Sequence, residues 1–279
     1  MTDVSAGRAS ATAWDGVAAS WERHQAHVAA AKVPVTEALL AALHLRPGDR
    51  VLELGAGTGE LAAQLTELVG ADGRVVATDA SGAMAAIAAR TLAGRPSATV
   101  QVADAARLDA FDSAEFDALV SRMGLMFLDD PAVGFREAHR VLRPTGRVAA
   151  AVWAGPEHNP WLTAVGMAAM GAGLPVTPPF GPGGPFSLGD PGDLEQMVVD
   201  AGFQEVSVLD VDLTFPFADA AAHVAICGSL APPLAPVLEQ ADDAQLEAVR
   251  QMVADATAGY ATDDGLRVPG RALVVSGHT

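Results

Sequence analysis

The sequence predicts an α/β protein with a doubly wound, mostly parallel sheet. Between residues 50 and 153, five apolar segments with the length of strands alternate with segments of helical periodicity. A turn with glycine at every second position, Gly55 to Gly59, joins the first strand to a helix. In an open sheet of this kind, ligands bind beyond the carboxyl ends of the strands. The alternation predicts the fold class, and the turn predicts where a ligand binds.

The expected elements follow the chain without an internal repeat. Residues 1–10 are expected to lack regular structure, and helices 14–31 and 35–43 form an N-terminal helical cap over residues 1–45. The core, residues 46–155, contains strands 50–54, 74–78, 99–103, 116–121 and 147–153 and helices 61–69, 83–93 and 131–142. Turns rich in Gly, Pro and Asp, such as 46–49 and 143–146, separate them.

After residue 155 the regular alternation ends. Residues 156–217 contain an expected helix at 160–170, a Gly- and Pro-rich loop at 171–191, a helix at 193–201 and a strand at 205–215. Residues 218–262 are expected to form a helical lid with helices 218–229 and 236–258, and residues 263–279 contain the last strand, 271–276. A loop as long as 171–191 is usually functional or mobile.

Composition excludes several classes of partner. The chain has 279 residues, half of them hydrophobic, and a net charge of −17. This charge disfavours nucleic acid and anionic membranes, because both bind clustered Lys and Arg. The single cysteine, Cys227, excludes an internal disulfide and fits a reducing compartment. We expect a soluble cytoplasmic protein, since neither a signal peptide nor an apolar run of spanning length is present.

The glycine turn is suited to a polar ligand. Glycine allows a sharp turn and close approach of the backbone, and the following helix N-terminus favours negative or polar groups. The dinucleotide fingerprint Gly-x-Gly-x-x-Gly and the phosphate loop Gly-Lys-Ser/Thr are both absent here. Glu53 stands in the apolar strand before the turn, and a buried carboxylate is costly unless it is paired or faces a ligand. The alternative is a solvated position on an edge strand.

The segment Val51 to Glu60 resembles the first motif of class I S-adenosylmethionine-dependent methyltransferases. Two further segments resemble the small-molecule branch of this family, which is similar to ubiquinone/menaquinone methyltransferases. They are Trp14-Asp15 with Trp21-Glu22, and Val141-Leu-Arg-Pro-Thr-Gly-Arg147. The resemblance covers about residues 14–155. It implies a Rossmann-like methyltransferase fold with a seven-stranded sheet, a final antiparallel hairpin, an N-terminal helical cap, a helical lid insertion and S-adenosylmethionine as cofactor.

The resemblance also implies roles for individual residues. The turn curves around the methionine and ribose of the cofactor, and Glu53 approaches its amino group. Asp79, about 20 residues beyond the turn, accepts hydrogen bonds from the ribose hydroxyls; the alternative is that it caps a helix. Asp104 binds the adenine amino group, and the alternative is an aspartate that only forms a turn. The complete expected cofactor set is Trp21, Glu53, Gly55, Ala56, Gly57, Thr58, Gly59, Asp79, Ala80, Met84, Asp104, Ala105 and Ser121.

The acceptor side is less defined by the sequence. Related O-methyltransferases often have a His after the fourth strand, and this chain has none there, which leaves His24, His27, His158 and His223. We favour His223 and His158 as catalytic residues. The expected substrate wall, for which ordinary core packing is the alternative, is Met123, Met126, Phe127, Trp153, Trp161 and Phe180. No spacing of metal ligands is present.

We therefore expect methyl transfer to a small hydrophobic acceptor, with O-methylation of a polyketide or aromatic natural product as the first hypothesis. The alternative is an enzyme that binds the same cofactor and catalyses a pericyclic or other rearrangement without methyl transfer. The identity of the acceptor, the choice among O, N and C, and assembly as a homodimer are left open by the sequence.

Overall fold

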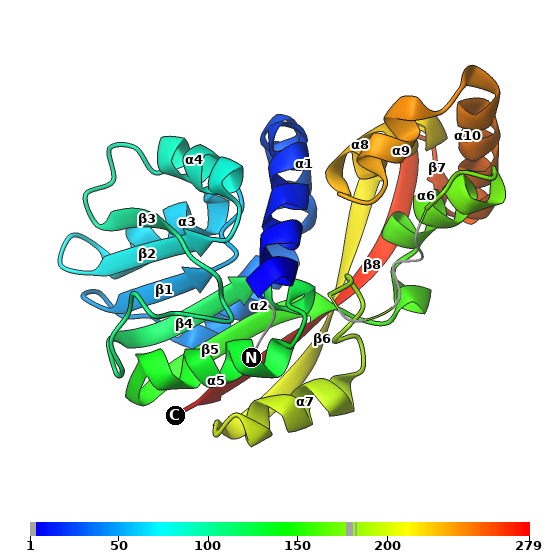
Figure 1. The fold of residues 1–279 in the computed structure, drawn as a ribbon. Helices are drawn as coiled ribbons and strands as arrows, with labels where there is room; N and C mark the ends of the chain where they lie inside the picture. Colours follow the sequence, from blue (N-terminus) through cyan, green and yellow to red (C-terminus); the bar gives the residue numbers. More distant parts are fainter. Residues whose placement is uncertain (1–3, 177–180, 182) are drawn as a thin grey trace.

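The computed structural model describes residues 4–176, 181 and 183–279, with residues 4–10 described by their backbone only. Over this part of the chain, eight strands form one sheet in the order β3-β2-β1-β4-β5-β8-β6, and the short β7 pairs with β8 (Figure 1). The strands are β1 Arg50–Leu54, β2 Arg74–Asp79, β3 Ala98–Val102, β4 Phe116–Arg122, β5 Leu142–Trp153, β6 Gln204–Phe217, β7 Ala261–Thr262 and β8 Gly265–His278.

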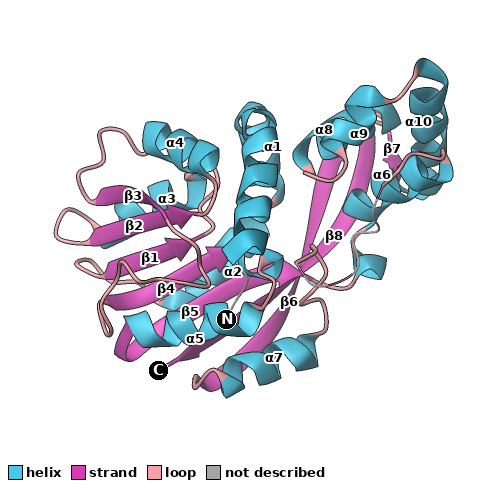
Figure 2. Ribbon diagram, in the orientation of Figure 1, coloured by secondary structure: helices cyan, strands magenta, loops and turns pink. Residues whose placement is uncertain are grey.

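Helices cover both faces of this sheet. The helices are α1 Val4–Ala31, α2 Val33–Leu43, α3 Glu60–Val69, α4 Gly82–Thr91, α5 Pro131–Val141, α6 Pro160–Gly171, α7 Pro191–Asp200, α8 Ala220–Leu230, α9 Ala235–Gln240 and α10 Asp243–Thr257, with 3-10 turns η1 Leu125–Phe127, η2 Pro156–His158 and η3 Ala258–Tyr260. In the view of Figure 2, α5 and α7 lie in front of the sheet, and α2 and α3 lie behind it. The central strands are therefore buried on both sides, with four of the five residues of β1 and six of the seven residues of β4 buried.

The antiparallel strands β6 and β8 carry the chain from the sheet to the lid. Each has 14 residues, and their pairing continues to Phe217 and Leu266, well past the last residue of β5 that pairs with β8. Helices α6, α8, α9 and α10 lie around this extension (Figure 1). Helix α1 stands between this group and α4, and it contacts both α4 and α8.

The expected fold class is confirmed. The first five strands pair in parallel, and the last long pair is antiparallel. Two local expectations are wrong. Residues 143–146 are part of β5 instead of a separate turn, with a left-handed φ of 64° at Thr145. The expected helix 236–258 is two helices, because Asp242 caps α10 in a reciprocal box with Gln245.

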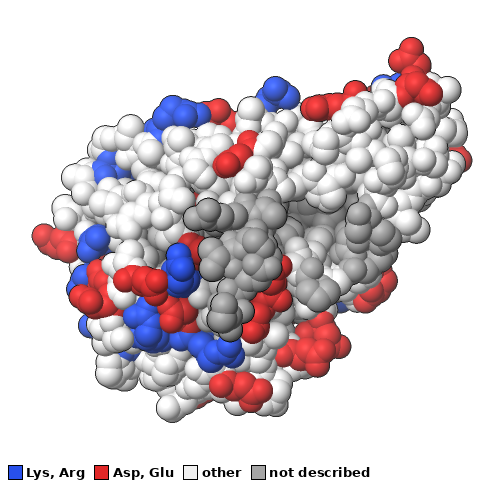
Figure 3. All heavy atoms as spheres, in the orientation of Figure 1, with Lys and Arg blue, Asp and Glu red and all other residues white. Residues whose placement is uncertain are grey.

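The expectation that residues 1–10 lack regular structure is also wrong from Val4 onward, because the N-terminal helix begins there. Among the described residues, no single helix is long and apolar enough to cross a membrane; one bent pair, Ala11–Ala31 with Val33–Leu43, passes that test by length and composition alone. On the face in Figure 3, basic side chains stand among acidic ones and do not form an uninterrupted positive patch.

Candidate active site

The glycine turn between β1 and α3 has a backbone that only glycine adopts without strain. Gly55, Gly57 and Gly59 have φ values of 69°, 56° and 80°. A Cβ on Gly59 would lie 2.9 Å from the Cα of Ala88 in α4, and one on Gly55 would lie 3.0 Å from the Cα of Gly124. The turn is therefore held between α4 and the segment after β4.

Asp79 fixes this turn from the end of β2. The Gly57 N–H donates to Oδ2 of Asp79 over 2.8 Å, and the Ser81 N–H donates to Oδ1 over 2.9 Å. The cap of α4 is Ser81, whose hydroxyl accepts from the Met84 N–H, so Asp79 is not the capping residue. Burial raises the pKa of Asp79 above its ordinary value, while the two amide donors oppose this shift.

Glu53 is a buried carboxyl group with an unsatisfied oxygen. Strand β1 lies between β2 and β4, so the alternative of a solvated edge position is wrong. Glu53 is only 2% exposed, and its Oε2 has no hydrogen-bond partner among the described residues. Burial raises the pKa of Glu53 to about 8. Such a group is costly in the free protein and is suited to a ligand that donates hydrogen bonds or carries positive charge.

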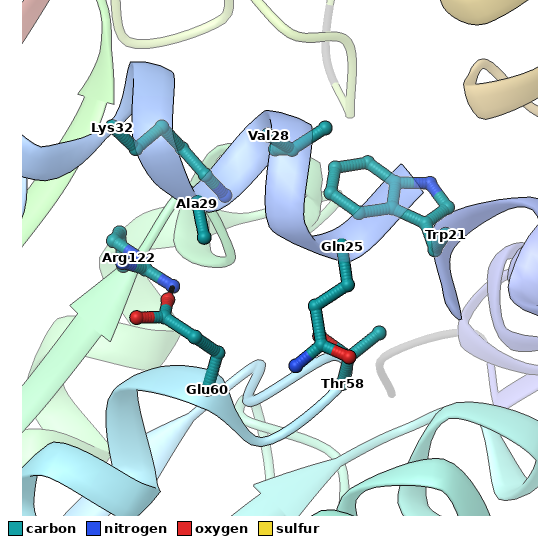
Figure 4. Close-up of a pocket in the computed structure, with 8 residues that line it drawn as sticks. All are labelled: Trp21, Gln25, Val28, Ala29, Lys32, Thr58, Glu60 and Arg122. Atoms are coloured by element: carbon teal, nitrogen blue, oxygen red, sulfur yellow. Dashed lines mark hydrogen bonds and ion pairs between the residues drawn. The ribbon is translucent and has the colours of Figure 1, made fainter. Parts of the chain in front are cut away.

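A small hollow lies between α1 and the glycine turn (Figure 4). Its volume is about 20 Å³, the space of a single water molecule. Gln25 extends across it toward Thr58, and Arg122 forms an ion pair with Glu60 at one end. A ligand the size of a nucleoside therefore enters only if α1 or its side chains move. The lining residues are Trp21, Gln25, Val28, Ala29, Lys32, Thr58, Glu60 and Arg122.

Two of these residues carry charge to which the sequence assigned no role: Lys32, and Arg122, which was expected only as part of the segment 122–127 that covers the cofactor centre. Lys32 is 7% exposed at the junction of α1 and α2, and its ammonium group lies 5.4 Å from the ring centre of Trp21. Arg122 ends β4 and donates to both Glu60 and Thr36. Neither residue belongs to a sequence motif. However, Lys32 is the only lysine in the chain, and that signal was available in the composition.

Helix α1 is tied both to the α4 region of the core and to the lid. Oδ1 of Asp15 accepts from the Ser81 hydroxyl over 2.5 Å and from the Ala83 N–H over 3.0 Å. The indole N–H of Trp21 donates to the carbonyl of Leu230, at the end of α8, over 2.9 Å. The same helix thus covers the glycine turn and contacts the lid.

The remaining residues of the expected cofactor set lie along the same edge of the sheet but have structural contacts of their own. Met84 is buried in a small cluster under α1. The Ser121 hydroxyl donates to the Leu54 carbonyl over 2.9 Å, and a carboxylate oxygen of Asp104 accepts from the Ala106 N–H over 2.9 Å. The Ala56 N–H donates to the Thr78 carbonyl. Ala80 and Ala105 lie in the loops after β2 and β3.

The expected substrate wall divides into two groups. Trp153, Trp161 and Met126 are buried core residues, and Trp161 stacks on Phe215 with 3.9 Å between ring centres. Met123 and Phe127 are only partly buried and lie after β4. The Phe127 ring meets the ring of Trp14 from α1 edge to face at 4.9 Å. Phe180 lies outside the described residues.

The two favoured histidines lie in different places. His158 is 44% exposed, pairs with Glu157 at 3.4 Å, and lines a separate hollow with Asp212 and Tyr260 that contains no residue of the glycine turn.

His223 is fully buried on α8, where its ring stacks on Phe217 at 4.2 Å. Its Nε2 lies 2.6 Å from the Trp161 carbonyl. Because a carbonyl only accepts, Nε2 carries the proton, and the buried Nδ1 is an acceptor without a partner in the described structure.

His27 contacts Phe217, the same ring on which His223 stacks. Its ring lies 5.5 Å from Phe217, and its buried Nε2 has no partner among the described residues. Burial lowers the pKa of both His27 and His223, so both rings are neutral at pH 7. The region between α1, the end of β6 and α8 therefore contains two unsatisfied imidazole nitrogens.

Comparison with known proteins agrees with this geometry. A family model described as a methyltransferase domain matches residues 52–150. The ubiquinone/menaquinone biosynthesis C-methyltransferase UbiE of Teredinibacter turnerae is 33% identical over 117 residues, which are 41% of this chain and 47% of that protein. The chain thus spans about half the length of the UbiE relatives that it matches.

One relative covers much more of the molecule. The nocamycin O-methyltransferase of Saccharothrix syringae is 34% identical over 203 residues, 67% of this chain and 71% of the relative. The chain belongs to the class I S-adenosylmethionine-dependent methyltransferases. The fold of this methyltransferase is also that of the YcgJ protein of Bacillus subtilis, with a TM-score of 0.57 and 18% identity over 88% of this chain and 97% of the other. The expected family and cofactor are therefore confirmed.

Proposed function

We propose that this methyltransferase transfers the methyl group of S-adenosylmethionine to a hydroxyl group of a small hydrophobic acceptor, such as an aromatic or polyketide natural product. The cofactor would supply a methyl group bonded to a positively charged sulfonium, from which the thioether sulfur can leave with the electron pair of the C–S bond as an acceptor oxygen bonds to the methyl carbon. The unpartnered, buried Oε2 of Glu53 and the glycine turn support cofactor binding at the end of β1. The relative that this chain matches over 71% of the relative's length is named an O-methyltransferase, which supports oxygen as the acceptor atom.

The unsatisfied Nδ1 of His223 is the observation that carries this proposal. An acceptor hydroxyl must lose its proton as the oxygen attacks carbon, and a neutral imidazole nitrogen takes such a proton. His223 holds its Nε2 proton against the Trp161 carbonyl, so the lone pair of Nδ1 is fixed in direction. The lowered pKa keeps this lone pair free at pH 7. We assign His223 as the general base, and the imidazolium then returns its proton to solvent when the product leaves.

The test is methyl transfer to a panel of phenols and hydroxylated polyketides. Product and S-adenosylhomocysteine are measured together by mass spectrometry. His223→Gln is the matched variant, because the glutamine amide can replace the Nε2–H donor to Trp161 but provides no basic nitrogen. We expect kcat to fall about 100- to 10,000-fold while cofactor affinity is unchanged.

Two results would contradict the proposal. Full activity of His223→Gln with an unchanged pH profile would remove His223 from the reaction. Conversion of an acceptor without formation of S-adenosylhomocysteine would favour the alternative, a rearrangement in which the bound cofactor is not consumed.

A further inference from the structure

Two histidines from different elements contact the same phenylalanine ring. Phe217 is the last residue of β6, His27 lies on α1, and His223 lies on α8. The ring centre of Phe217 lies 4.2 Å from that of His223 and 5.5 Å from that of His27. Because α1 packs against both α8 and β6, these rings are part of the interface between α1 and the lid. One small molecule that enters this interface can therefore reach both imidazoles.

Each of the two imidazoles has one buried nitrogen without a hydrogen-bond partner. These atoms are Nδ1 of His223 and Nε2 of His27, and the described part of the chain contains only one other such side-chain atom, Oε2 of Glu53. An unpaired buried polar atom costs about 1–3 kcal/mol. Two such atoms around a single ring therefore indicate a ligand that supplies the missing partners.

The chemistry of the two nitrogens indicates which partner they need. Nδ1 of His223 only accepts, because the proton of this neutral ring is held on Nε2 by the Trp161 carbonyl. For His27, no hydrogen bond within the described part of the chain fixes the proton, so both tautomers have to be considered. A hydroxyl group satisfies Nε2 of His27 in either tautomer, since a hydroxyl both donates and accepts. A carbonyl group would satisfy only the protonated Nε2, and an ammonium group only the unprotonated one.

We propose that the acceptor has two hydroxyl groups, and that His27 binds the second of them while His223 takes the proton of the first. The inference rests on the proposed function, because His223 identifies the hydroxyl that is methylated. No bond to the second oxygen is made or broken, so this hydroxyl leaves unmethylated. His27 is then a specificity-determining residue, and the substrate class narrows from hydroxylated ring compounds to diols.

A diol bound in this way connects α1 to the lid. The indole N–H of Trp21 on α1 already donates to the carbonyl of Leu230 at the end of α8 over 2.9 Å. A ligand that bonds to His27 on one side and to His223 on the other adds two hydrogen bonds across the same interface. A ligand with a single hydroxyl bonds to the lid alone. The diol therefore favours the position in which α1 covers the glycine turn.

A binding comparison with matched aromatic alcohols tests the proposal without catalysis. The ligands are 1-naphthol and a series of dihydroxynaphthalenes that differ only in the spacing of their two hydroxyls. Each is titrated into the wild type and His27→Phe with S-adenosylhomocysteine present, so that no methyl group is transferred. We expect at least one diol to bind the wild type about 10-fold more tightly than 1-naphthol. In His27→Phe, which keeps a flat ring beside Phe217, this ratio should fall to within about three-fold, with the affinity for 1-naphthol unchanged.

Two further variants are matched to His27→Phe. The amide of His27→Gln has both a donor and an acceptor, so this variant should restore most of the preference for the diol. His24 lies one turn earlier on α1, and neither of its ring nitrogens is among the buried atoms without a partner, so His24→Phe should keep the wild-type ratio. No preference for any diol in the wild type, or a preference that survives in His27→Phe, would overturn the proposal. Equal weakening of the diol and 1-naphthol by His27→Phe would mean a structural role and would also overturn it.

Hydrogen exchange of the wild type provides a readout that needs no variant. The preferred diol should slow exchange in α1 near His27 and in α8 near His223, whereas 1-naphthol should slow it in α8 alone. Equal protection of α1 by both ligands would contradict a contact between His27 and the second hydroxyl. A failure of the proposed function is separate from these outcomes: without methyl transfer to any acceptor the binding ratios still hold, whereas transfer to 1-naphthol and to every diol with equal kcat/KM would support the function and overturn the diol site.

Discussion

Replacing Lys32 by methionine should stabilise the free protein. Burial lowers the pKa of Lys32 from 10.5 to about 7, with Arg122 as a secondary cause and Glu60 and Glu53 opposing the shift. A change of this size corresponds to an upper limit of about 4–5 kcal/mol of destabilisation when the site is protonated. Relaxation of the side chain and entry of water reduce this cost, and we expect about 2–4 kcal/mol.

The sign of the effect follows from the two protonation states. Between about pH 7 and 10.5 the unfolded chain holds a proton on Lys32 that the folded protein has released. The free energy of unfolding of the wild type therefore rises with pH across this window. Lys32→Met lacks this dependence. Its gain in the free energy of unfolding over the wild type is therefore complete below about pH 7 and disappears toward pH 10.5.

Urea denaturation of both proteins at about pH 6, 8 and 10 measures this difference. Glu53→Gln is the internal control, because burial raises the pKa of Glu53 to about 8 from 4.5. Its stabilising effect should have the opposite pH dependence, complete above about pH 8 and absent below about pH 4.5. A Lys32→Met variant that is no more stable than wild type at pH 6, or equally stabilised at every pH, would refute a buried and unpaired ammonium group.

Three further predictions concern the turn, the ribose position and the cap helix. Asp79→Ala should weaken cofactor binding by about 1.5–3 kcal/mol through lost charge-assisted hydrogen bonds; near-wild-type titration would contradict ribose binding. Gly59→Ala should lower the free energy of unfolding by more than about 1 kcal/mol, because φ is 80° and the new Cβ would lie 2.9 Å from Ala88; an unchanged thermal midpoint would disprove this. Trp21→Phe removes the hydrogen bond to Leu230, and hydrogen exchange in α1 should rise.

Much of the fold could be predicted because its signals are local. Strand β1 is mostly apolar, the glycines of the turn require left-handed backbone, and each βα unit repeats the same alternation. The break between α9 and α10 was missed because helical periodicity continues across it, whereas the capping box at Asp242 depends on side chains three residues apart. Ser81 could have been chosen over Asp79 as the helix cap from its position just before α4.

The charged part of the site could not be predicted in the same way. Lys32, Glu53 and Arg122 are far apart in sequence and are brought near the same hollow only by the packing of the α1–α2 junction over β1 and β4. A lysine at a helix junction has no periodic or spacing signal, and only its rarity in this composition was visible. The tautomer of His223 likewise depends on the Trp161 carbonyl, which is 62 residues distant in the chain.

The attachment of α1 to both α4 and the lid affects how cofactor can enter and leave. The helix closes the space above the glycine turn to about 20 Å³, and the Asp15 and Trp21 bonds hold it to α4 and α8. A nucleoside can enter only if α1 or its side chains move, and a movement of α1 would also change its contact with the lid. We expect the contacts of α1 to open each time cofactor enters and each time demethylated cofactor leaves.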